Sequence, residues 1–130
     1  MILPKLSAAI LSMSFFGTAY AGVDLNRDTS LDQWVVISGA TNGAADVLGA
    51  SREDIDEHRN TALGHLMRYA REHGLQVREF DQLFERGQME GRKLVQTHHG
   101  LVVATRDEFI NGFRYDKSID YQHIEKVLNT

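Results

Sequence analysis

Four oxygen-bearing side chains stand at alternate positions near the start of the chain: Asp24, Asn26, Asp28 and Ser30. This is the spacing with which an EF-hand loop presents oxygen ligands to a calcium ion. Such a loop also needs glycine at its sixth position and a bidentate glutamate at its twelfth. Counted from Asp24, those positions hold Thr29 and Val35. We therefore interpret this stretch as a polar lead-in to a helix that Thr29 or Ser30 caps.

Two histidines have the spacing that brings side chains onto one face of a helix. His58 and His65 are separated by two helical turns, about 10 Å along the axis, which is too far for both to bind one ion at about 2 Å. A metal site would need further ligands such as His98 or His99, and no zinc-hydrolase motif accompanies them. We therefore predict solvated histidines. The alternative is a periplasmic metal- or small-ligand-binding protein that uses these four residues.

The sequence offers little for catalysis. It contains no cysteine, which excludes thiol nucleophiles and disulfides, and it has neither a G-x-S-x-G elbow nor a phosphate-binding glycine loop. A glycosidase needs a carboxylate of raised pKa in a long cleft, and nothing distinguishes Glu53, Glu57 or Glu90 for that role. We predict a protein that is not an enzyme and needs no cofactor. A small peptidoglycan-active enzyme is the less favoured alternative.

The first 21 residues have the organisation of a cleavable export signal. Lys5 precedes the apolar run SAAILSMSFFG, and Ala19 and Ala21 form the small-residue pattern of a cleavage site. The run is shorter than the roughly 20 residues of a membrane-spanning helix, so we predict no membrane span. We expect cleavage after Ala21, a mature chain of residues 22–130 and a periplasmic location. The net charge of −4 disfavours nucleic acid as a partner.

The mature chain has the pattern of one helical domain. Its clearest helix begins at a cap formed by Ser51 with Asp54 and stops at Gly74, with one apolar face between them. Similar signals predict helices over about 30–48, 75–100, 105–116 and 118–128, although Asn42-Gly43 is a turn signal inside the first.

These helices predict an all-α bundle of four to five members in which helices 51–74 and 75–100 are antiparallel neighbours. The alternative is an α+β fold in which WVVIS, residues 34–38, and LVVAT, residues 101–105, pair as a two-stranded ribbon.

Two glycine pairs, Gly39/Gly43 and Gly87/Gly91, each recur after one helical turn. Because glycine costs about 1 kcal/mol inside a helix, each pair needs a reason: close approach of two helices, or a shallow groove that receives a partner. We favour close approach and leave the groove open. If a groove forms, its adaptable apolar surface consists of Phe84, Gly87, Met89 and Gly91.

Acidic side chains supply the other half of a predicted partner-binding surface: Glu53, Asp54, Asp56, Glu57, Glu85 and Glu90. An acidic surface would steer a basic partner into contact, although the same residues also suit a solvated helix face. The sequence thus predicts an exported protein-binding domain, most concretely an inhibitor or immunity protein that blocks a secreted toxin or a cell-wall enzyme. Association with a second copy of the chain remains open.

Overall fold

The structure, a computed structural model, describes residues 30–77, 79–98 and 106–128. These ranges contain five helices and no strand: α2 (Ser30–Val47), α3 (Arg52–Glu72), α4 (Phe80–Thr97), α6 (Arg106–Asp116) and α7 (Tyr121–Leu128). The predicted all-α fold is confirmed. Residues 34–38 belong to α2, so the predicted ribbon is wrong, and its other half, residues 101–105, lies outside the described residues.

Residues 1–29 also lie outside the described part of the chain. The predicted signal peptide and the calcium-like residues Asp24, Asn26 and Asp28 fall there, whereas Ser30 is the first residue of α2. In the ranges that the structure does describe, no helix has the length and apolar character needed to cross a membrane.

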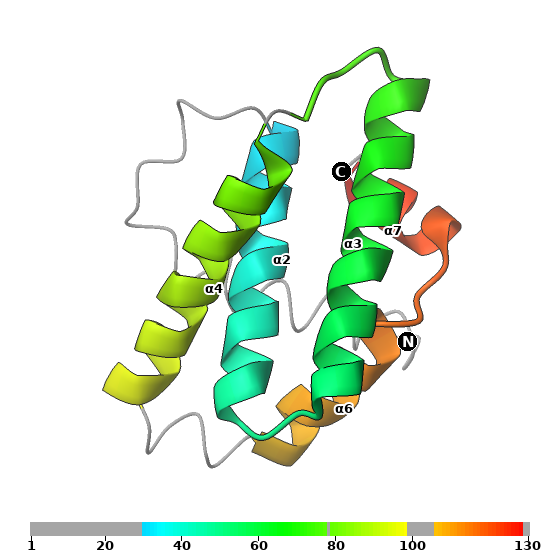
Figure 1. Ribbon diagram of the computed structural model, residues 1–130. Helices are drawn as coiled ribbons and strands as arrows, with labels where there is room; N and C mark the ends of the chain where they lie inside the picture. The colour runs from blue at the N-terminus through cyan, green and yellow to red at the C-terminus, as the bar shows by residue number, and fades with distance from the viewer. Residues whose placement is uncertain (1–29, 78, 99–105, 129–130) are drawn as a thin grey trace.

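The bundle is organised around α2, which lies between α3 and α4 (Figure 1). Every residue of α2 from 35 to 45 is buried. A helix that is apolar all round must be covered on every side, and here the covering comes from α3, α4, α6 and α7. The predicted antiparallel course of α3 and α4 is confirmed, and Arg59 of α3 contacts Phe80, Asp81 and Phe84 of α4. Each of the two helices nevertheless packs mainly on α2.

Local sequence signals explain the limits of α3. The backbone N–H of Asp54 donates a hydrogen bond to the Ser51 hydroxyl at 3.1 Å, which is the predicted cap. At the other end Gly74 has a φ of +64°, and the N–H of Leu75 donates to the Ala70 carbonyl at 2.8 Å. This is the bond of a Schellman motif, and it turns the chain toward α4. The start of α4 is at Phe80 rather than near Leu75, directly after Glu79, whose backbone is left-handed.

The two glycine pairs form the contact between α2 and α4. A Cβ atom at Gly43 would lie 2.2 Å from the Gln88 carbonyl oxygen, and one at Gly91 would lie 2.1 Å from the Ala40 oxygen. Gly39 and Gly87 make equivalent approaches to the facing backbone. Because the contacts advance in the same order along both helices, α2 and α4 are parallel. Close approach, the favoured explanation of the glycines, is confirmed.

Candidate functional site

The predicted partner-binding residues of α4 divide between its two sides. Phe84, Gly87 and Gly91 are buried against α2, so the structure places them in the helix contact rather than in an open groove. Met89 is 67% exposed. Glu85 and Glu90 are exposed beside it and make no hydrogen bond or ion pair with any described residue. We call these three residues the outer face of α4.

Two of the four acidic residues predicted on α3 serve an internal contact. Lys117 places its Nζ 3.0 Å from a Glu57 carboxylate oxygen and 3.4 Å from Asp54, which is also 3.7 Å from Arg114. The hydrogen bond from Lys117 to Glu57 raises the pKa of the lysine above its ordinary value. Glu53 and Asp56 are exposed. The acidic start of α3 is therefore not wholly available to a partner, because it holds the end of α6.

Other polar side chains of α3 continue this contact along the C-terminal segment, residues 117–128. The Thr61 hydroxyl donates to the Lys117 carbonyl at 2.6 Å, and His65 Nε2 lies 2.7 Å from the Ile119 carbonyl, to which its N–H donates. Further along, the Tyr121 hydroxyl donates to Glu72 at 2.8 Å. Burial, together with this bond, raises the pKa of Tyr121 to about 12. The contributing positions 54, 57, 61, 65 and 72 share one helical face, and this spacing is visible in the sequence.

Removing one of these bonds should loosen the C-terminal segment. Thr61→Val deletes the donor to the Lys117 carbonyl, and a lost hydrogen bond of about 1 kcal/mol should make backbone amide exchange in α7 about fivefold faster. Hydrogen-exchange mass spectrometry measures this, with Thr97→Val at the exposed end of α4 as the matched control. Unchanged exchange in α7 would show that the bond does not hold the segment.

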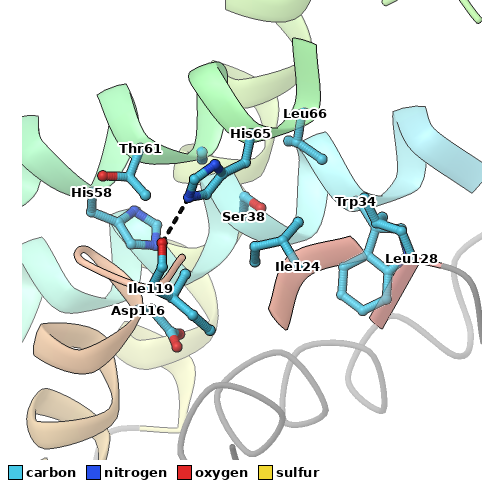
Figure 2. A pocket seen from close by; sticks show the side chains of 11 residues that line it. Trp34, Ser38, His58, Thr61, His65, Leu66, Asp116, Ile119, Ile124 and Leu128 are labelled. Carbon is cyan, nitrogen blue, oxygen red and sulfur yellow. Dashed lines mark hydrogen bonds between the residues drawn. The ribbon is translucent and has the colours of Figure 1, made fainter. Parts of the chain in front are cut away.

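A pocket of about 30 Å³ lies between α2, α3 and the C-terminal segment. Figure 2 shows His58 at one end, Trp34 at the other, and Ser38 and His65 between them. Apolar side chains from both sides, including Leu66 and Ile124, form much of the remaining wall. The pocket is separate from the outer face of α4, because α2 stands between them (Figure 1).

His58 is 5% exposed, so its prediction as a solvated histidine is wrong. The amide nitrogen of Asn42 lies 3.0 Å from both the Ile55 carbonyl and His58 Nδ1, and Asn42 Oδ1 accepts from Gln88 at 2.8 Å. The nitrogen is thus the donor, so His58 Nδ1 accepts and the ring proton resides on Nε2. Burial lowers the pKa of His58 to about 3, which keeps the ring neutral at pH 7.

Three of the four histidines named for the alternative metal site are described in the structure, and these three do not converge. His58 and His65 both line the pocket, but His98 lies at the end of α4 with its Nδ1 3.3 Å from the Leu94 carbonyl. His99 lies outside the described residues. Within residues 30–77, 79–98 and 106–128, no three His, Cys, Asp or Glu side chains are grouped so that they could hold a metal ion. Because His58 and His65 line the pocket, a small ligand is a better candidate for this region than a metal ion.

Comparison with known proteins identifies no relative of this chain. No protein-family model matches the chain, and neither a curated protein nor a solved structure does so. The two candidate regions, the outer face of α4 and the pocket, therefore depend on their own geometry.

Proposed function

We propose that the chain is an exported, non-enzymatic domain that binds and blocks another protein, most concretely a secreted toxin or a cell-wall enzyme. The observation that carries this proposal is the outer face of α4, where Met89 is 67% exposed between two carboxylates that pair with no described residue. Methionine repacks easily against a partner surface, and flanking charges form the polar rim that surrounds an apolar contact.

The glycine contact supports this role by making α4 a rigid platform. Four glycines bring the backbone of α4 against that of α2. This close packing fixes the position of α4 on α2 and therefore the orientation of its outer face. Binding through a pre-ordered surface avoids part of the entropy that a flexible segment would lose. The inner side of α4 therefore serves stability, while the outer face serves recognition.

Charge supports a basic partner. The chain has a net charge of −4, and cleavage of the predicted signal would remove Lys5 as well. Glu85 and Glu90 would then pair with basic side chains on the partner rather than within the domain. Such pairs speed association at low ionic strength and are screened by salt.

Affinity capture tests the proposal. The purified protein, immobilised, is incubated with periplasmic and secreted fractions of its own source at low and at high salt. We expect one protein to be retained in stoichiometric amount, with weaker retention at high salt. When the domain is added to the captured protein in equal amount, the activity of that protein should be lost.

Two methionine variants connect the capture to the outer face of α4. Met89→Ala should weaken retention about tenfold or more, as truncation of a central interface residue does. Met67→Ala, at a 40% exposed position on α3, is the matched control and should retain the partner fully. Capture of no protein, or equal retention by both variants, would contradict the proposal.

A further inference from the structure

Asp116, which is buried, lines the pocket, and so do two polar groups, the Ser38 hydroxyl and His58 Nε2–H, that make no hydrogen bond with a described residue. Ser38 is 5% exposed, and its hydroxyl makes no hydrogen bond with any residue in the described part of the chain. His58 is equally buried; its Nδ1 is bonded to Asn42, and its Nε2–H has no acceptor among the described residues. A polar group inside a protein is stabilised by a hydrogen-bond partner, so an occupant that satisfies both groups would be favoured.

The size of the pocket limits that occupant. A volume of about 30 Å³ has room for two or three water molecules, or for a molecule of about four to five non-hydrogen atoms. Trp34, Leu66 and Ile124 give it an apolar wall against which a short alkyl group would pack. Water would satisfy the polar groups but would leave this wall poorly covered.

The polar groups define the chemistry of the occupant. His58 Nε2–H can only donate, so the ligand must offer an acceptor, whereas the Ser38 hydroxyl either donates or accepts. No described lysine or arginine lines the pocket, His58 is neutral, and the one acidic residue of the lining is Asp116, so an anion would find no positive charge. A primary amide has both a carbonyl acceptor and an N–H donor without a net charge.

We propose that this pocket binds a small primary aliphatic amide, with its carbonyl oxygen at His58 Nε2–H, its nitrogen at the Ser38 hydroxyl and its alkyl group against Trp34. The site is independent of the proposed protein-binding role, because α2 separates it from the outer face of α4 (Figure 1). Failure of either proposal therefore leaves the other standing.

Trp34 makes the test direct, because it is the only tryptophan of the chain and lines the pocket (Figure 2). Propionamide is titrated into the purified full chain while tryptophan fluorescence is followed. We expect a saturable change with a Kd of about millimolar, since a ligand of five non-hydrogen atoms has few contacts. Propionate, which has the same alkyl group but a negative charge, should bind at least about tenfold more weakly.

Two serine variants locate the binding. Ser38→Ala should weaken propionamide binding about fivefold to tenfold, because it removes one hydrogen bond while leaving the wall intact. Ser118→Ala, at an exposed serine of the C-terminal segment, is the matched control and should bind as the native protein does. Circular dichroism checks that both variants keep the native helix content.

A second variant and a second signal keep the test decisive. Ala62→Leu places a larger side chain in the pocket wall and should abolish the saturable change. In ¹⁵N spectra, saturating propionamide should shift the Nε2 resonance of His58. A fluorescence change that never saturates, or equal binding by Ser38→Ala and the native protein, would overturn the proposal and leave water as the occupant.

Discussion

Gly43→Ala is expected to destabilise the domain by about 3 kcal/mol or more. A Cβ atom at this position would lie 2.2 Å from the carbonyl oxygen and 2.7 Å from the Cα of Gln88. Both atoms are backbone, so no change of side-chain rotamer relieves the clash, and α2 and α4 must move apart along their whole contact. Movement would also strain the buried hydrogen bond between Gln88 and Asn42.

Gly64→Ala provides the matched comparison. Gly64 is exposed in the interior of α3, and a Cβ atom there would have no neighbour within 4 Å. Alanine should therefore stabilise the domain by about 0.5–1 kcal/mol through helix propensity alone. Urea unfolding followed by circular dichroism measures both variants. Similar effects at positions 43 and 64 would mean that α2 and α4 do not approach as the structure has them.

Acid should destabilise the domain through His58 before most carboxylates are protonated. Burial lowers the pKa of His58 to about 3, whereas the unperturbed value is 6.5. Between pH 6.5 and about pH 3, His58 is therefore protonated in the unfolded chain but neutral in the folded domain. The contribution of the neutral His58 ring to the free energy of unfolding is therefore complete above pH 6.5 and is lost as the pH falls toward 3. Between pH 7 and pH 4 the free energy of unfolding should fall by about 3 kcal/mol through His58 alone.

His58→Gln separates this contribution from that of the carboxylates. Glutamine supplies an oxygen that can accept from Asn42 but does not titrate, so the loss of unfolding free energy between pH 7 and pH 4 should be about 3 kcal/mol smaller than in the native protein. His73→Gln, at an exposed position after α3, should keep the native pH dependence. Urea titrations at each pH measure the three proteins. An undiminished loss in His58→Gln would show that His58 is not buried as a neutral ring.

The helical fold could be predicted because its signals are local. Ser51 and Gly74 limit α3 through bonds within a few residues, and the cost of glycine in a helix interior favoured a close helix contact at the pairs 39/43 and 87/91 over a groove. Which helix provides that contact could not be read from the chain. The parallel pairing of α2 with α4 depends on tertiary packing, whereas the prediction assumed that helices adjacent in sequence are neighbours.

The candidate site was predicted only in part, because burial is not local. His58 has the same helical spacing from polar neighbours as a solvated histidine. It is a core residue because of tertiary contacts, among them Phe113, with a ring centroid 4.6 Å away, and the hydrogen bond from Asn42. Asn42 looked like a turn residue, but inside α2 its amide joins His58 to Gln88. Asp54 and Glu57 were assigned to a partner because the sequence did not show that Lys117 would reach them.

Methionine oxidation of the captured complex tests the proposed binding role most directly. Met1 and Met13 fall within the predicted signal, so Met67 and Met89 are the two methionines of the expected mature chain. In the free domain both should be oxidised, because they are 40% and 67% exposed. In the complex we expect Met89 to be protected and Met67 to react as before. Equal oxidation of Met89 in the free domain and in the complex would contradict a binding role for the outer face of α4.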